Sequence, residues 1–239
     1  DVAVHSAKDL PPETAPGLVL AAFPERVDSR DALVAHPGGA HTLAELPRRA
    51  RIGTGSARRA SQLLAYRSDY EVLPLRGNVD TRLRKIEEDG LHAVILAAAG
   101  LERLGLAGRI HERIETRIML PSAGQGTLAL ETREGDALQE SLRALDHGPT
   151  RLCLLAERAF VAGLSGDCHA PIAAFAEVGS DGRLRLRGRV LSPDGDRDVT
   201  ADASGSPSEA VALGRGAAEE VLARGADVLL AAAREAALA

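Results

Sequence analysis

Short apolar runs alternate with amphipathic stretches along the first half of the chain. The runs are bounded by turn residues, as buried strands are, and two longer stretches repeat apolar residues at helical spacing. Up to about residue 117 the pattern predicts strands at residues 2–5, 18–23, 32–35, 51–54, 71–75 and 93–97, and helices at residues 57–66 and 81–89. Strands that alternate with helices are typical of an α/β fold.

A segment interrupted by Pro and Gly, residues 120–131, predicts a hinge or a crossing between two parts of the molecule. The composition changes after residue 146. From there on the pattern predicts a helix at residues 150–164, strands at 171–178, 183–191 and 196–203, and two alanine-rich helices at 206–224 and 226–238.

The chain opens with Asp1-Val2-Ala3-Val4-His5, an apolar alternation that predicts a buried strand. Because a fold rarely begins inside a core strand, we expect that an N-terminal segment is missing from this chain.

The composition is that of an ordinary globular protein, with 45% apolar and 26% charged residues, which excludes a disordered or low-complexity chain. The longest uncharged apolar stretch, residues 93–101, is too short to cross a bilayer, and no leader pattern opens the chain, so we expect a cytoplasmic protein. The two cysteines, Cys153 and Cys168, form no CxxC motif, which argues against a disulfide framework and a zinc site. We expect no metal.

Charge is unevenly distributed along the chain. The net charge of −5 gives no reason to expect a nucleic acid or a membrane as partner, but residues 48–85 carry nine Arg and one Lys against three acids. Nucleic-acid binding through this segment ranks last among the hypotheses, because Tyr66 and Tyr70 are its only aromatic residues.

The first candidate site follows the first expected strand, where open α/β sheets bind ligands. It brings together Ser6, Lys8 and Asp9. A carboxylate beside a lysine stays ionised, which suits it to stabilise a cation or to move a proton. The alternative is a plain turn in which Asp9 forms a surface ion pair.

Two further segments, residues 53–59 and 75–82, place small residues or Arg between a strand and a helix, as anion sites do. Arg58 and Arg59 oppose the helix dipole, which an external anion would explain. Several arginines at one cleft favour a ligand with several carboxylates. We therefore expect that replacing Arg58, Arg59, Arg76 or Arg82 weakens ligand binding and leaves thermal stability nearly unchanged. The remaining arginines of this region are interpreted as solvated surface residues: Arg48, Arg49, Arg51, Arg67 and Arg84.

The two cysteines differ in their surroundings. Cys153 lies at apolar spacing inside a helix and is expected in the core. Cys168 lies in a predicted loop, where it is either a nucleophile, a covalent attachment point or an incidental thiol. The adjacent His169 adds little, because neighbouring side chains usually point apart.

These segments, taken together and in order, resemble the porphobilinogen deaminase (hydroxymethylbilane synthase) family. They are HSAKDLP (residues 5–11), GTGSARR (53–59), LRGNVDTRL (75–83), AAGLERLG (98–105), GQG (124–126), AERA (156–159) and GDC (166–168), which span essentially the whole chain.

The resemblance implies a transferase that joins four porphobilinogen molecules into hydroxymethylbilane with release of ammonia, in heme biosynthesis. It implies a dipyrromethane cofactor bound as a thioether to Cys168, and Asp9 as the catalytic residue that stabilises the cation formed when ammonia leaves. The positions implied to hold carboxylate side chains or the cofactor are Ser6, Lys8, Thr54, Ser56, Arg58, Arg59, Arg76, Arg82, Arg103, Gln125 and the backbone of Leu96 and Ala97.

The resemblance also implies the architecture. We expect two α/β lobes like those of periplasmic binding proteins, joined by a hinge, and a small C-terminal α+β domain with a three-stranded sheet. The expected division is residues 1–25 with 122–144, a second domain at 26–121, and a C-terminal domain at 145–239. We expect a monomer whose partner is the small-molecule substrate alone.

Two features depart from the family pattern. The family has a longer first domain, and it usually has Gly-Gly-Cys where this chain has Gly166-Asp167-Cys168. The extra carboxylate would raise the pKa of the neighbouring thiol. The alternative function is a non-catalytic hinged binding module for a polycarboxylate solute, which would need neither Asp9 nor Cys168.

Overall fold

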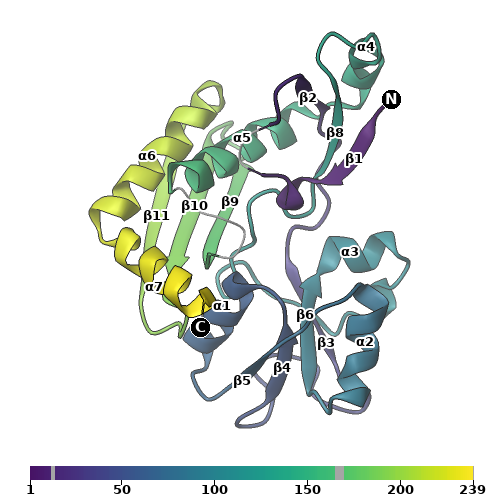
Figure 1. Ribbon diagram of the computed structural model, residues 1–239, viewed down its shortest axis with the longest axis vertical. Coiled ribbons are helices and arrows are strands. Elements are labelled where there is room, and N and C mark those ends of the chain that lie inside the picture. Colours follow the sequence, from purple (N-terminus) through teal and green to yellow (C-terminus); the bar gives the residue numbers. More distant parts are fainter. Residues whose placement is uncertain (12–13, 165–169, 239) are drawn as a thin grey trace.

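The computed structural model describes residues 1–11, 14–164 and 170–238. Within these ranges the strands form three sheets, each with its own helices (Figure 1). The first sheet has the order β1-β8-β2, and both of its strand pairs are antiparallel. Its strands are β1 (Ala3–Ser6), β8 (Leu128–Arg133) and β2 (Leu18–Ala22).

The second sheet has the order β5-β4-β6-β3-β7 and mixes parallel and antiparallel pairs. Its central strands are buried on both faces, because apolar side chains from helices cover each side. The strands are β3 (Asp31–Ala35), β4 (Arg51–Thr54), β5 (Glu71–Pro74), β6 (Ala93–Ala97) and β7 (Glu112–Arg113), and the helices are α1 (Ala57–Tyr66), α2 (Val79–Glu88) and α3 (Ala98–Arg103).

The third sheet is an antiparallel meander of β9 (Ile172–Val178), β10 (Leu184–Leu191) and β11 (Asp198–Gly205). Helices α5 (Gly148–Gly163), α6 (Ala210–Ala223) and α7 (Ala226–Leu238) pack with it around one core. Phe160 of α5 fills the middle of that core, where a Cβ added to Gly188 would lie 2.4 Å from its ring. This packing makes the C-terminal part a compact α+β unit.

The remaining elements are short. They are α4 (Leu138–Leu142) and 3-10 helices at Ala7–Asp9, Ala107–Arg109, Arg143–Leu145 and Pro207–Glu209. In the part of the chain that the structure describes, none of the helices combines the length and the apolar character needed to cross a membrane.

The chain passes twice between the first and second sheets, through residues 23–30 and again through residues 120–127. We call these the two crossing segments. They are tied to one another by the side chain of Gln125, whose Nε2 donates to the carbonyl oxygen of Ser29 at 2.7 Å, and by the backbone amide of Val27, which donates to Gly126 O at 3.3 Å. The two connections therefore act as one paired strap between the lobes.

The expected α/β class and the C-terminal three-stranded sheet are confirmed. The strands predicted at residues 51–54 and 93–97 and the helices predicted at 57–66 and 226–238 have the predicted bounds. The helix predicted at 206–224 divides into a 3-10 turn and α6, and α3, α4 and β7 were not predicted. The three sheets fall inside the three expected domain ranges, although the domain boundaries themselves stay a prediction.

The prediction that the first strand is buried is wrong. The side chain of Val4 in β1 is 62% exposed. The physical reason is the strand order, since β1 lies at the edge of its sheet and pairs only with β8. Apolar alternation alone cannot separate such an edge strand from a central one.

Candidate functional site

A cavity of about 630 Å³ lies where the three parts of the molecule meet. Side chains of opposite character form its walls: cationic groups from the turn after β1 and from α1, α2 and α5, and apolar groups from the C-terminal unit. Its lining residues are Ala7, Lys8, Asp9, Leu10, Pro11, Gly55, Ser56, Arg58, Arg59, Arg82, Ser122, Ala123, Gln125, Arg158, Val161, Ala170 and Ile172.

Lys8 and Asp9 enter the cavity from the 3-10 turn that ends β1. The second crossing segment packs directly against this turn, because Ala7 N donates to Thr127 O at 2.9 Å and a Cβ on Gly124 would lie 3.0 Å from Lys8 N. Gly124 has a φ of +74°, so a side chain there would be strained as well as crowded. The turn is thus held by a glycine contact that no larger residue could make.

The environment of Lys8 destabilises its charged form. Burial and the guanidinium of Arg59 lower the pKa of Lys8 to about 8, while Asp9 and Asp31 act in the opposite direction. Lys8 can therefore lose or gain a proton near neutral pH, depending on which anion lies beside it.

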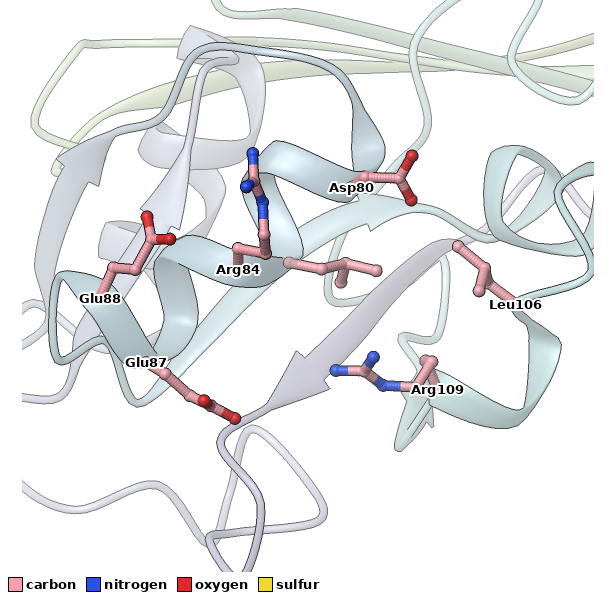
Figure 2. A pocket seen from close by; sticks show the side chains of 7 residues that line it. Asp80, Arg84, Glu87, Glu88, Leu106 and Arg109 are labelled. Carbon is pink, nitrogen blue, oxygen red and sulfur yellow. The ribbon is translucent and has the colours of Figure 1, made fainter.

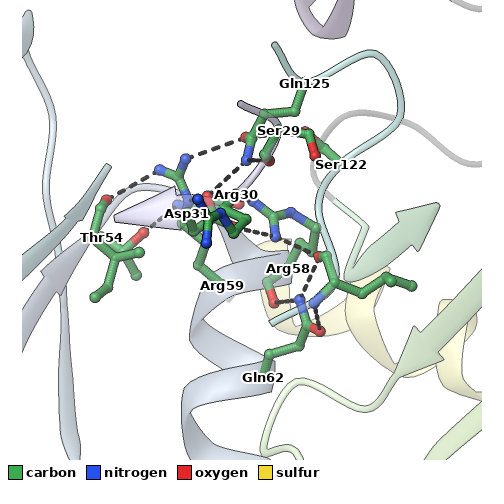
Figure 3. Close-up of polar contacts among 12 residues, drawn as sticks. Ser29, Arg30, Asp31, Thr54, Arg58, Arg59, Gln62, Ser122 and Gln125 are labelled. Atoms are coloured by element: carbon green, nitrogen blue, oxygen red, sulfur yellow. Dashed lines mark hydrogen bonds and ion pairs between the residues drawn. The ribbon is translucent and has the colours of Figure 1, made fainter. Parts of the chain in front are cut away.

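Arg58 and Arg59 extend from the first turn of α1 to a single buried carboxylate, that of Asp31 at the start of β3 (Figure 3). Arg58 donates from Nη1 to Asp31 Oδ2 at 2.7 Å, and Arg59 donates from Nε to Asp31 Oδ1 at 2.8 Å. Burial alone would raise the pKa of this carboxyl, but the two guanidinium groups hold it well below its usual range. The group carries two positive charges and one negative charge.

The two arginines therefore differ from the sequence expectation. Each is only 4% exposed and is ion-paired within the chain, so Asp31 explains their place at the helix N-terminus without an external anion. Both still line the cavity. The expectation that they could be replaced without loss of stability conflicts with a buried ion pair, because removing one partner leaves an uncompensated charge.

The glycines of residues 53–59 also serve packing inside the chain. A Cβ on Gly55 would lie 2.4 Å from Leu75 O, so the close backbone approach is to the neighbouring strand rather than to a ligand. Ser56 lines the cavity as expected, whereas Thr54 is buried and lies outside the lining.

Gln125 and Arg82 are brought to the cavity as expected. Gln125 is fully buried and donates from Nε2 to Asp31 Oδ1 at 3.0 Å, which links the second crossing segment to the arginine pair. Arg82 donates from Nε to Gly77 O at 2.8 Å, so its terminal nitrogens stay available to the cavity. Asp31 and Arg158 were not among the predicted site residues, although an acid that opens an otherwise apolar strand indicates a buried partner.

Several predicted site residues do not line the cavity: Ser6, Thr54, Arg76, Leu96, Ala97 and Arg103. Arg76 is exposed and forms no ion pair with a residue that the structure describes. Arg103 donates from Nη2 to Gly126 O at 2.8 Å and so contacts the second crossing segment. Ser6 directly precedes the turn of Lys8 and Asp9, although it does not line the cavity.

Of the two cysteines, Cys168 lies outside the described residues, together with Gly166 and Asp167. Cys153 is buried in the C-terminal core, as expected, and burial raises its pKa to about 11. At neutral pH it is therefore a protonated thiol and a poor nucleophile.

A second cavity, of about 340 Å³, lies between α2 and residues 106–109 (Figure 2). Its side chains carry charges of both signs: Asp80, Arg84, Glu87 and Glu88 come from α2, and Leu106 and Arg109 come from the segment that follows α3. Arg84 was expected to be a surface residue, and none of the predicted site residues lines this cavity.

Two family models match the chain. One is described as the dipyrromethane cofactor binding domain of porphobilinogen deaminase and matches residues 1–141. The other is described as the C-terminal domain of porphobilinogen deaminase and matches residues 151–223. The two together reach from the turn of Lys8 and Asp9 to the end of α6.

Curated relatives agree with the family models. The porphobilinogen deaminase of Brevibacillus brevis is 48% identical over 239 residues, which cover 98% of this chain and 75% of the relative. That of Roseiflexus sp. strain RS-1 is 50% identical over 234 residues, covering 97% and 75%. That of Thermus thermophilus is 48% identical over 232 residues, covering 97% and 76%.

Among solved structures, a periplasmic binding protein of Salmonella typhimurium with high arginine specificity is similar to 52% of this chain and 56% of its own. The TM-score is 0.31 at 19% identity, a likeness too weak to carry an argument. The family models and the curated relatives carry the assignment instead. On their evidence, the chain belongs to the porphobilinogen deaminase family.

Proposed function

We propose that this chain is a transferase that condenses four porphobilinogen molecules head to tail into hydroxymethylbilane and releases one ammonia for each. Family membership supports this reaction. The observation that links this reaction to particular residues is the cavity that Lys8 and Asp9 line together with apolar side chains and four arginines from three helices.

The cavity suits the chemistry of the substrate. Porphobilinogen combines a flat pyrrole ring with two carboxylate side chains, so it needs apolar surface and several cations at once. Leu10, Val161 and Ile172 supply apolar surface, while Arg82 and Lys8 supply donors for carboxylates. At about 630 Å³ the cavity is within the size range of small-molecule sites.

The dipyrromethane cofactor of the family fits the same residues, since it carries the same rings and the same carboxylates. When bound, it supplies the pyrrole chain to which the first substrate is joined. We propose that Lys8, Arg59 and Arg82 hold its carboxylates and that Cys168, outside the described residues, is its point of attachment.

Asp9 is the residue proposed to act on the reacting atoms. The aminomethyl group of porphobilinogen reacts as its ammonium form: when the C–N bond breaks, nitrogen leaves with the bonding pair and its three protons as ammonia, and the substrate becomes a cation. A carboxylate in the cavity stabilises that cation. After the new C–C bond forms, the attacking ring carbon must lose a proton, and the carboxylate of Asp9 is the proposed acceptor.

The alternative function, a receptor for a polycarboxylate solute, uses the same cations. The presence of Asp9 argues against a receptor, because a carboxylate in the cavity repels an anionic ligand and would lower the affinity of a receptor for it. An enzyme that forms a cation gains from the same charge. The monomeric state and the cytoplasmic location expected from the sequence stay predictions.

Intact-mass spectrometry of the purified protein tests the proposal. We expect a covalent mass increment equal to a dipyrromethane, lost in Cys168→Ser and kept in the matched variant Cys153→Ser. We also expect consumption of porphobilinogen with release of ammonia. An unmodified wild-type chain that binds porphobilinogen without consuming it would favour the receptor.

A further inference from the structure

Asp31 is enclosed by donors from three parts of the chain. Its Oδ1 accepts from Arg59 Nε at 2.8 Å, from Gln125 Nε2 at 3.0 Å and from Arg58 Nη2 at 3.2 Å, and its Oδ2 accepts from Arg58 Nη1 at 2.7 Å. The carboxylate is 0% exposed, so no solvent reaches it. Asp31 itself does not line the cavity, whereas its partners Arg58, Arg59 and Gln125 do.

Arg58 and Arg59 differ in how many of their terminal nitrogens are free to bind a ligand. Arg58 is largely committed, since its Nη1 also donates to Leu120 O at 2.7 Å and its Nη2 is held by Asp31. Arg59 donates from Nη1 to Ile95 O at 3.1 Å, but its Nη2 has only a long contact of 3.5 Å with Gln125 Oε1. Arg58 Nε has no hydrogen-bond partner among the described residues, but it is buried. Among the four terminal nitrogens of the two guanidinium groups, Arg59 Nη2 therefore has the weakest contact within the described chain.

We infer that Asp31 is a positioning residue for the carboxylate-binding step. It fixes the guanidinium of Arg59 so that Nη2 can donate to a ligand carboxylate, while Arg58 helps to hold Asp31 in place. The inference deepens the proposed function and rests on it. A guanidinium that is held by a fixed partner loses less rotational freedom when it binds a carboxylate, so binding is tighter. The second effect of Asp31 is on charge, because it cancels one of two adjacent positive charges.

The test compares Asp31→Asn with a matched control, Asp146→Asn. Asp146 also accepts from one arginine through both oxygens, with Arg151 Nε at 2.7 Å and Nη2 at 2.9 Å, but neither residue lines the cavity. We expect both variants to lower the melting temperature. Only Asp31→Asn should raise the KM for porphobilinogen, by about tenfold, the size of one weakened charge-assisted hydrogen bond, with kcat changed less.

A spectroscopic measurement keeps the inference separate from the proposed function. In a ¹H–¹⁵N spectrum of arginine Nε–H groups, the Arg59 signal should shift in Asp31→Asn and stay in place in Asp146→Asn. If wild-type protein does not consume porphobilinogen, the proposed function fails, and this signal still decides whether Asp31 holds Arg59.

Should Asp31→Asn not fold, the double variant Asp31→Asn/Arg58→Gln removes one charge of each sign and restores the balance. The same rise in KM and the same shift of the Arg59 signal are expected in it. An unchanged KM in either foldable variant, or an Arg59 signal identical to that of the wild type, would overturn the inference and leave Asp31 a purely structural residue.

Discussion

Glu157 and Arg26 form a buried ion pair in which Arg26 Nη1 lies 2.6 Å from Glu157 Oε1. Glu157 belongs to α5 and also accepts from the backbone amides of Gly124 and Ala176, both at 2.7 Å. Arg26 lies in the first crossing segment and donates from Nε to Gln125 O at 2.8 Å. One carboxylate thus joins the C-terminal unit to both connections between the lobes.

Replacing this carboxylate should lower stability strongly. Glu157→Gln leaves Arg26 as an uncompensated buried charge, and we expect a loss of about 3 kcal/mol in the free energy of unfolding. Urea denaturation measures it. The control is Glu220→Gln, whose partner Arg224 lies 3.2 Å away at a half-exposed site, where a change below about 0.5 kcal/mol is expected. Equal losses in the two variants would show that burial of the pair is irrelevant.

The pKa of Lys8 predicts how binding depends on pH. A ligand carboxylate binds the ammonium form, and in the ligand-free protein that form is lost as the pH rises through about 8. The KM for porphobilinogen should therefore rise above pH 8 in the wild type. In Lys8→Arg the charge persists, so the rise should disappear. A wild-type KM that is constant between pH 7 and pH 9 would contradict the prediction.

The lowered pKa of Lys8 also predicts whether the free energy of unfolding rises or falls with pH. Because the pKa of Lys8 is lowered from 10.5 to about 8, the folded chain binds fewer protons at this site than the unfolded chain between these two pH values. The stability contributed by Lys8 should then increase with pH across that window. The difference in unfolding free energy between wild type and Lys8→Met, measured at pH 7.5 and pH 9.5, should move in favour of the wild type.

The arginines of the cavity should divide into two classes. Arg82→Ala should raise the KM roughly tenfold at nearly constant melting temperature, since Arg82 forms no ion pair within the described ranges. Arg58→Ala should lower the unfolding free energy by about 3 kcal/mol, because Asp31 then loses a buried partner. Thermal denaturation together with steady-state kinetics separates the classes, and a stable Arg58→Ala protein would refute the assignment.

Asp9 should act mainly in the transition state. Asp9→Asn removes the charge that stabilises the substrate cation, so kcat should fall by about a hundredfold, roughly 3 kcal/mol, with little change in KM. Asp9→Glu keeps the charge and should be milder. A receptor would instead bind an anion more tightly after Asp9→Asn. Initial rates of porphobilinogen consumption decide between the two.

The turn between β10 and β11 should tolerate no side chain at Gly195. A Cβ there would lie 2.4 Å from Ser61 O and 2.5 Å from Ala65 N, so Gly195→Ala pushes against the backbone of α1. Gly182 is a matched control, because its φ of +74° is almost the same as the +75° of Gly195 and no atom lies within 4 Å of its added Cβ. We expect Gly195→Ala to lose about 2 kcal/mol more than Gly182→Ala in urea denaturation. Equal losses would mean that backbone conformation alone matters.

Much of the fold could be predicted because it depends on local patterns. Strand β6 is a continuous apolar run, and α1 and α7 show apolar residues at helical spacing. The burial of β1 was predicted wrongly because the exposure of its side chains depends on its place in the strand order. Strand order is set by contacts with residues far along the chain, which periodicity does not contain.

The site was predictable only in part for the same reason. The position of Lys8 and Asp9 at a strand end pointed to a ligand, and both line the cavity. The roles of Arg58 and Arg59 depend on Asp31, which lies 27 residues before Arg58, and nothing in the pattern pairs them. The sequence shows which residues are charged, whereas the partner of each charge is a property of the folded chain.

The strand order β1-β8-β2 also has a consequence for how the molecule assembles as it folds. In the central strand β8, Leu130 pairs with Val4 of β1, and Arg133 pairs with Leu18 of β2, so this sheet cannot close before the chain is complete to that point. The meander of β9, β10 and β11 pairs only near neighbours. Because contacts between distant residues form slowly, β1 and β2 must wait for a strand that lies far along the chain before they can pair. Closure of this sheet, which completes the turn carrying Lys8 and Asp9, is therefore expected to limit the rate at which the site appears during refolding.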